Sequence, residues 1–266
     1  MAFYWKKCNF AQYNTDDKSA GNNRFDDSMR NPVQSEFLSG FFKTGGGEYG
    51  EGDKFLGIRC PQTRSVVKAA GREIELEEVD KLLASEWHEI RLCGFLLLVE
   101  QMQGCLSKRV RLSVRAASRR RELTDFYLAH SHQANNWDLV DMSCPKILGN
   151  FLLNPLPDGT MPSRQILYSL AASDNLWDQR IAVVTNWMLI RAGEFDDLIR
   201  ISDMLLPHPH DLIHKAVGWM LREMGKESPE ALEEYLSLNH GKMSRTTLRY
   251  AIEKLPEPER QRWMRM

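Results

Sequence analysis

Trp137 and Asp141 lie four residues apart in the segment NNWDLVD. On a helix this spacing puts both side chains on one face. An aromatic face beside a carboxylate suits a reaction that develops positive charge on a sugar, because both groups attract a cation. The alternative is a packed ring next to an ordinary surface acid. The setting favours chemistry, because similar segments recur in LWDQRIAVV, which contains Trp177, and in LIHKAVGW, which ends at Trp219.

Length and composition limit the protein class. The chain has 266 residues, of which 42% are hydrophobic, enough for one large domain or an elongated repeat array. The apolar run GFLLLV is far too short to span a bilayer, and MAFYWKKCNF does not resemble a signal peptide. Five cysteines without a C-x-x-C or zinc pattern predict reduced thiols. We therefore expect a cytoplasmic protein that requires neither a metal nor another cofactor.

Charge is segregated along the chain. A formal net charge of -1 argues against a uniformly basic nucleic-acid binder. The segment KRVRLSVRAASRRR, residues 108–121, nevertheless carries seven basic residues and no acid. Within it, RVRLSV alternates apolar and polar residues and could suit a strand, but helical patterns flank it, so a basic connector is the better prediction. A solvated loop and an anion-binding surface remain open alternatives for this segment.

The first part of the chain lacks a sustained hydrophobic period. Residues 1–35 are polar and rich in Asn and Asp, which predicts a poorly ordered segment before a single domain over 36–266. The glycine-dense FFKTGGGEYGEGDKF follows. It is not a phosphate-binding loop, because Lys43 and Thr44 precede the glycines, whereas a Walker loop ends in Gly-Lys-Ser/Thr. We predict a turn-rich connection there.

Helical spacing dominates from Gln62 onward, with proline-rich breaks in LNPLPDGTMP and PHPH. Five helical segments can be aligned so that one equivalent position recurs at intervals of 50, 39, 35 and 34 residues. That position holds Arg91, Asp141, Arg180, Lys215 and Arg249. Such periods are typical of stacked two-helix units. The sequence therefore predicts an all-α, HEAT-like helical-repeat solenoid, a curved α-α superhelix.

Equivalent positions of a solenoid line one surface, which here would be a cationic strip interrupted by one carboxylate. Such a strip suits a polyanionic backbone, above all duplex DNA. The alternative is that these cations pair with acids on adjacent helices and stabilise the stack. Asp141, beside Trp137 and with Trp219 as a candidate second aromatic, could stabilise a sugar cation and orient water. An alkylated purine, charged at N3 or N7, would leave such a cation behind when its weakened glycosidic bond breaks.

Several of these segments together resemble a known family. They are NNWDLVDMSCPKILGNFLL, SDNLWDQRIAVVTNWMLIRAGEFDDLIRISDMLL, HPHDLIHKAVGWMLREMGK and RTTLRYAIEKLP. They are similar to the AlkD-type bacterial DNA alkylation repair proteins from about Glu122 to Pro256. FFKTGGGEYGEGDKFLGIRCPQTR resembles the N-terminal region of that family, whereas residues 1–35 and 103–119 fit it poorly.

The resemblance implies a monofunctional glycosylase that cradles duplex DNA and excises N3- or N7-alkylpurines without flipping the lesion into a deep pocket. Asp141 matches the catalytic carboxylate, and Trp137 and Trp219 match two aromatics that embrace the lesion's sugar-phosphate. Arg180 and Arg222 match basic residues near DNA, and Lys215 joins them by the repeat argument alone. A monomer working on the DNA of a bacterial cytoplasm is expected, with no membrane partner.

Two other functions remain open at this stage. The helical repeat could recognise damaged or branched DNA without catalysis, or it could be a scaffold for a protein partner, in keeping with its near-neutral charge. A metal site formed by His208, His210 and His214 is a weaker hypothesis, since no acid or cysteine of matching spacing accompanies them. Helix capping or phosphate contact is the better prediction for these histidines.

Overall fold

The computed structural model describes residues 29–266, and this part of the chain is helical, with turns and one isolated bridge between Lys54 and Trp87. The all-α prediction is confirmed. The chain divides into two compact units, Met1–Ser143 and Cys144–Met266. Most of the expected disordered segment lies outside the described residues. A helix already begins at Pro32, and the expectation of one domain over 36–266 stays a prediction.

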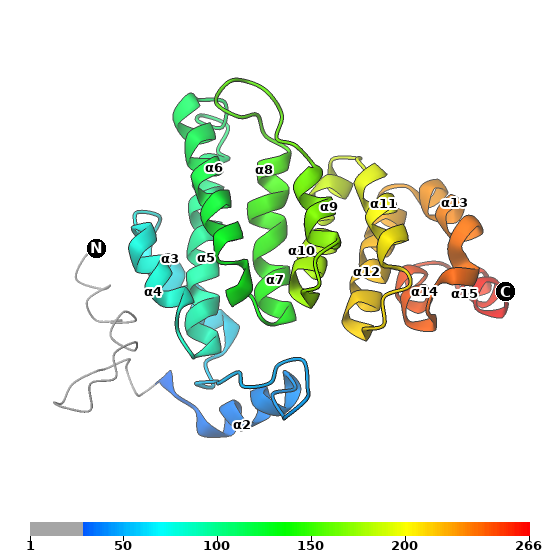
Figure 1. Ribbon diagram of the computed structural model, residues 1–266, viewed down its shortest axis with the longest axis horizontal. Coiled ribbons are helices and arrows are strands. Elements are labelled where there is room, and N and C mark those ends of the chain that lie inside the picture. Colours follow the sequence, from blue (N-terminus) through cyan, green and yellow to red (C-terminus); the bar gives the residue numbers. More distant parts are fainter. Residues whose placement is uncertain (1–28) are drawn as a thin grey trace. The chain divides into compact units, whose positions relative to one another are not determined.

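Unit 1 contains the first helices that Figure 1 labels. They are α2 (Pro32–Phe41), α3 (Cys60–Ala70), α4 (Leu76–Leu83), α5 (His88–Cys105), α6 (Val114–Ala129), the 3-10 turn η3 (Ser131–Gln133) and α7 (Trp137–Cys144). Helix α5 is apolar around almost its whole circumference and is buried from His88 to Val99. Such a helix needs neighbours on all sides, and α3, α4 and α6 pack against it.

Unit 2 continues as antiparallel helices (Figure 1). They are η4 (Pro145–Gly149), α8 (Asn150–Leu152), α9 (Gln165–Ala171), α10 (Leu176–Arg191), α11 (Asp196–Leu205), α12 (Asp211–Glu227), α13 (Pro229–Asn239), η5 (His240–Lys242), α14 (Arg245–Ala251) and α15 (Glu257–Arg265). Helix α12 is the central one, since it packs against α10, α13 and α14. This succession of paired helices agrees with the predicted helical repeat.

Local sequence signals set many of the helix starts. Side chains at the N-cap accept a backbone N–H of the first turn, which satisfies a donor that the helix leaves unpaired. These residues are Asn31, Ser113, Asn175, His210, Ser228 and Ser244. The predicted breaks are confirmed as well: residues 153–164 connect α8 to α9, 206–210 connect α11 to α12, and 106–113 form a turn-rich connector before α6.

Candidate active site

Trp137 starts helix α7 and lies in an aromatic cluster built by distant segments. Its backbone N–H donates to the side-chain oxygen of the preceding Asn136 at 2.9 Å. The indole stacks on Phe42, with ring centroids 5.3 Å apart, and meets the edge of Phe41 at 6.0 Å. Phe42 also packs on Phe55 and on the imidazole of His88. The ring of Trp137 therefore has fixed neighbours but remains half-buried.

A buried network of charges lies under this cluster. His88 Nδ1 is 2.7 Å from Asp53 Oδ2, and its Nε2 is 2.9 Å from Asp138 Oδ2. Arg91 donates to Asp53 at 2.6 Å and to Asn135 at 3.0 Å. Asp138 is the residue next to Trp137, so the network joins the start of α5 to the start of α7. Two positive and two negative groups balance, and the network adds no net charge beneath the aromatic cluster.

The network holds His88 in its charged form. Burial alone would lower the pKa of His88, but the charge and hydrogen bond of Asp138, together with those of Asp53, raise it to about 9. Burial would raise the pKa of Asp53, yet His88 and Arg91 hold it below its ordinary value. An imidazole with a carboxylate at each nitrogen donates from both, which only the charged ring can do. At neutral pH His88 is therefore an imidazolium, and its contact with Asp138 holds the start of α7 in place.

The glycine-rich segment, residues 45–52, reaches the cluster because glycines allow close backbone approach. A Cβ atom on Gly50 would lie 2.3 Å from the carbonyl oxygen of Phe42. Farther along, Gly57 has φ +82° and a Cβ atom there would lie 2.1 Å from the carbonyl oxygen of Asn31. Glu89 then fixes the irregular stretch around Gly57, accepting the backbone N–H groups of residues 56–58 at 2.8 to 3.0 Å. The turn-rich connection predicted for FFKTGGGEYGEGDKF is confirmed by the turns at residues 42–52.

Asp141 lies one turn after Trp137 on α7, and both side chains are half-buried. The helical spacing on which the hypothesis rests is therefore present. Between them, Leu139 and Val140 are fully buried and hold this turn in the core. The pair is thus a ring and a carboxylate on a helix whose start is held by the buried network.

Trp219 lies on α12 of unit 2, where it is half-buried next to Trp187, with ring centroids 5.9 Å apart. Its Nε1 donates to Glu223 Oε1 at 3.2 Å. The carboxylate of Glu223 also accepts Lys226 at 2.7 Å and Arg222 at 3.4 Å. Arg222 forms a further ion pair with Glu253 of the segment after α14. A mixed charge cluster therefore holds Trp219 in place.

Comparison with known proteins agrees with this architecture. The sequence profile of the family described as DNA alkylation repair enzyme matches residues 27–255, most of the chain. The chain belongs to that family. A solved structure described as a predicted DNA alkylation repair enzyme from Enterococcus faecalis is similar in fold, with a TM-score of 0.61 and 19% identity. The similarity covers 86% of this chain and 98% of that one. No curated protein matches the chain.

The expected cationic strip of this DNA alkylation repair family member is not formed at two of its positions. Arg91 is 4% exposed and belongs to the buried network, and Arg180 is 5% exposed and donates to the Leu212 carbonyl at 2.7 Å. Lys215 pairs with Asp211 one turn earlier at 2.7 Å, and Arg249 is exposed. The repeat alignment gave each residue its helical position, but neighbouring helices decide which positions solvent reaches. The alternative of cations that stabilise the stack describes Arg91 and Arg180 better.

The histidine cluster near α12 serves capping, as expected. His210 accepts the backbone N–H of Leu212 at 3.1 Å, and His214 Nε2 lies 2.6 Å from the carbonyl oxygen of His208. Burial lowers the pKa of both His208 and His210. In residues 29–266 no group of three or more His, Cys, Asp or Glu side chains has the arrangement of a metal site. In the same range no helix is long and apolar enough to cross a membrane.

Sequence reasoning missed Asp53, His88 and Asp138 as a group. His88 and Asp138 occupy equivalent positions 50 residues apart in the repeat alignment, but equivalence does not predict contact, and Asp53 lies outside the aligned segments. One signal was available: ionisable residues rarely lie in strongly apolar segments unless they are paired, and His88, Glu89 and Arg91 all lie at the start of the apolar helix α5.

Proposed function

We propose that the chain is a monofunctional DNA glycosylase that excises cationic N3- or N7-alkylated purines from duplex DNA. Membership of the DNA alkylation repair enzyme family supports a role in repair of alkylated DNA. The observation that carries the finer proposal is the pair on α7, a half-buried indole followed one turn later by a half-buried carboxylate. This pair suits a reaction in which positive charge develops on deoxyribose.

Each residue has a distinct part in the proposed reaction. As the purine departs, its C1′–N bond breaks, the electron pair leaves with the base, and a cation remains on the sugar. Asp141 stabilises that cation and orients the water whose oxygen then bonds to C1′ and whose proton is released. Trp137 contacts the sugar-phosphate with the part of its indole that Phe41 and Phe42 leave exposed. An alkylated purine is already a cationic leaving group, so the step needs no additional acid.

The second unit is assigned DNA contacts. Trp219 is proposed as the second aromatic at the sugar-phosphate, and Arg222 and Lys215 as cations near the DNA backbone. Both cations already have carboxylate partners, Glu253 and Asp211, so binding to phosphate would exchange one anion for another. Arg180 is buried, and its proposed contribution is indirect: it holds the carbonyl of Leu212 and hence the first turn of α12. We also propose that the protein acts in the cytoplasm as a monomer.

Base release from duplex DNA containing 7-methylguanine tests this function. Purified protein should release the base faster than buffer, and Asp141→Asn should reduce the rate at least about 100-fold, the usual loss when one transition-state electrostatic contact is removed. Affinity for undamaged duplex should change less than about twofold. Asp125→Asn is the matched control, because Asp125 is an exposed acid of α6 in the same unit. Duplex binding by the wild type without any base release would leave the non-catalytic DNA-binding function instead.

A further inference from the structure

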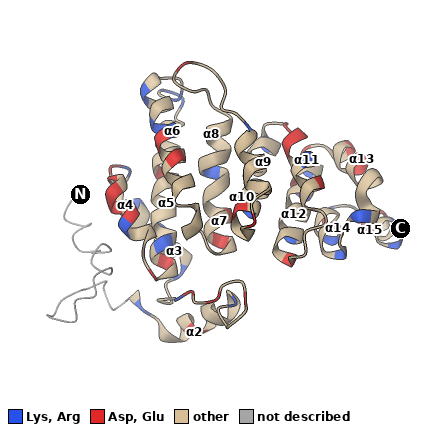
Figure 2. Ribbon diagram, in the orientation of Figure 1, with Lys and Arg blue, Asp and Glu red and all other residues tan. Residues whose placement is uncertain are grey.

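The connector between α5 and α6 (residues 106–113) and the first turn of α6 present cations that form no ion pair with the described residues. Lys108, Arg109, Arg111 and Arg115 are all exposed, and none of them pairs with an acid in the part of the chain that the structure describes. The next arginines behave differently, because Arg119 and Arg121 pair with acids of α6. Figure 2 shows the blue segments at this end of α6. The connector therefore carries uncompensated positive charge.

Apolar side chains alternate with these cations. Leu112 is 73% exposed, Val114 65% and Val110 39%. Single exposed aliphatic residues are common on protein surfaces, but three within five residues, at the end of the connector and the start of α6, form a patch. We call the seven residues together the connector patch: Lys108, Arg109, Val110, Arg111, Leu112, Val114 and Arg115. It offers hydrophobic contact and positive charge to the same partner.

The patch is held in a fixed shape from below. Arg120 of α6 is 1% exposed, and its guanidinium donates to the carbonyl of Arg111 at 2.7 Å and to that of Cys105 at 3.4 Å. Ser113 caps α6 and also donates to the carbonyl of Val110 at 2.7 Å. Burying a guanidinium costs free energy, and here its hydrogen bonds go to the connector. A fixed surface loses little conformational entropy on binding.

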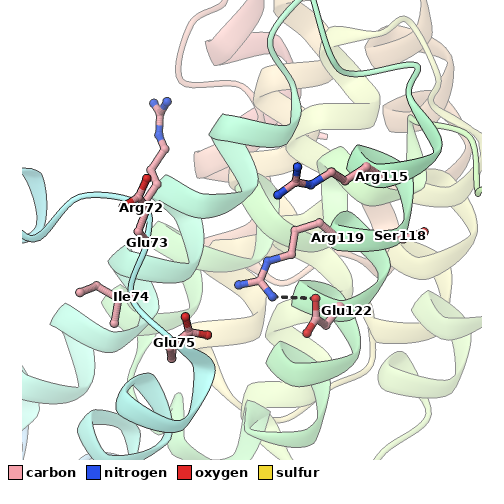
Figure 3. A pocket seen from close by; sticks show the side chains of 8 residues that line it. All are labelled: Arg72, Glu73, Ile74, Glu75, Arg115, Ser118, Arg119 and Glu122. Carbon is pink, nitrogen blue, oxygen red and sulfur yellow. Dashed lines mark hydrogen bonds and ion pairs between the residues drawn. The ribbon is translucent and has the colours of Figure 1, made fainter.

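One edge of the patch continues into a cavity of about 710 Å³. Figure 3 shows Arg115 reaching from α6 toward the connection between α3 and α4, where Arg72 and Glu73 line the other side. Glu122 pairs with Arg119 at its floor. The cavity contains acids as well as arginines, so its lining does not form an anion site by itself.

The connector patch and the candidate active site lie at opposite ends of α5. His88 at the first residue of that helix touches Phe42, which stacks on Trp137, whereas the connector follows its last residue, Cys105. A helix of 18 residues is about 27 Å long at 1.5 Å per residue. The patch is therefore separate from the aromatic cluster.

We propose that the connector patch binds an acidic amphipathic segment of another protein. Carboxylates of that segment pair with Lys108, Arg109 and Arg111, and its aliphatic side chains cover Leu112 and the two valines. Charge complementarity selects an acidic partner, and it would direct encounter as well as binding. This interaction is additional to the proposed glycosylase function.

Two other occupants fit the observations less well. A DNA backbone offers phosphates but no partner for exposed Leu112 and Val114, and phosphate contacts need only the cations. A bilayer would take up apolar side chains, but three aliphatic residues without Trp or Phe bury little apolar surface compared with the aromatic faces of membrane-surface helices. Only an acidic segment with aliphatic side chains uses both parts of the patch.

Fluorescence anisotropy with labelled probes tests the proposal on the full chain. The probe is a three-turn helical peptide with leucines on one face and glutamates elsewhere. Arg111→Glu should weaken its binding about tenfold, and Leu112→Ser about fivefold through lost apolar burial. Lys68→Glu, an exposed charge reversal on α3, and Leu238→Ser, a leucine 71% exposed on α13, are the matched controls and should bind as the wild type does.

Further probes separate the alternatives. A peptide of glutamates alone should bind more weakly than the amphipathic peptide and should not respond to Leu112→Ser. The proposal is overturned if the amphipathic peptide does not bind, or if Arg111→Glu and Leu112→Ser bind it as well as the controls do. It is also overturned if these variants bind the peptide normally and lose affinity only for undamaged duplex DNA or for phosphatidylserine vesicles. No damaged DNA is used, so the result is independent of the glycosylase assay.

Discussion

Each unit holds a tryptophan followed four residues later by an acid, yet the two pairs are supported in different ways. In unit 1, Trp137 stacks on Phe42 above a buried network that includes His88, and Asp141 follows one turn later. In unit 2, the acid Glu223 is itself the hydrogen-bond partner of Trp219 and is surrounded by cations. The same sequence pattern thus gives a ring fixed by the core in one unit and a ring fixed by a partly exposed charge cluster in the other.

This difference indicates where rigidity is built in. Buried ion pairs are costly to form, and losing one partner leaves an unpaired charge in the core. Ion pairs that water reaches, such as that between Arg222 and Glu253, contribute less because water and salt screen them. We therefore expect the start of α7 to depend on a few specific residues, and the surface of α12 to tolerate substitution.

The largest expected effect is the difference in stability lost on replacing Arg91 and on replacing Arg222. Arg91→Leu leaves the fully buried carboxylate of Asp53 short of a partner and should lower the free energy of unfolding by about 3 to 5 kcal/mol. Arg222→Leu breaks a partly exposed cluster, in which the side chains of Arg222 and Glu253 are 17% and 44% exposed, and should cost about 1 kcal/mol. Urea titrations followed by circular dichroism measure both. Equal losses for the two variants would remove the contrast between the units.

A smaller effect should appear as pH dependence in unit 1. The pKa of His88 in the folded protein, about 9, lies above its ordinary value of 6.5. The stabilisation from its charged form is therefore complete below pH 6.5 and is lost as the pH rises through 9, to a total of about 3 kcal/mol.

Urea titrations from pH 6 to pH 10 measure this loss, and His88→Gln should flatten that part of the profile. NMR of the imidazole nitrogens gives a second readout, since both should carry protons at neutral pH. A wild-type profile that His88→Gln leaves unaltered would show that His88 is not the titrating group.

The smallest expected effect is the difference in stability lost on replacing two glycines that both have positive φ, Gly57 and Gly159. Gly57→Ala places a Cβ atom against the backbone of Asn31 and should cost about 2 to 3 kcal/mol. Gly159 has φ +85° with nothing near its Cβ position, so Gly159→Ala should cost only the conformational strain, about 1 kcal/mol. Thermal melts compare the two. If Gly159→Ala proved the more costly, close packing of the segment near Asn31 would not be what requires glycine.

The sequence was sufficient for what depends on local pattern. Hydrophobic period predicted helices and proline-rich segments predicted breaks, because both act over a few residues. Helical spacing put Trp137 and Asp141 on one face of α7, and the combined segments indicated the DNA alkylation repair family. The position of Arg180 within its repeat could be predicted, but its burial against the start of α12 could not.

What the sequence by itself determined was therefore the helical type of the elements after Gln62, the breaks at the proline-rich segments and the family of the chain. Only the tertiary structure decided which charges meet. Asp53, His88 and Asp138 come from three separate segments, and Arg91, which was expected on the surface, is buried and pairs with Asp53. The physical reason is the range of the interactions. Backbone hydrogen bonds and side-chain spacing act within one helix, whereas burial and the pKa of a buried group depend on every segment packed around it.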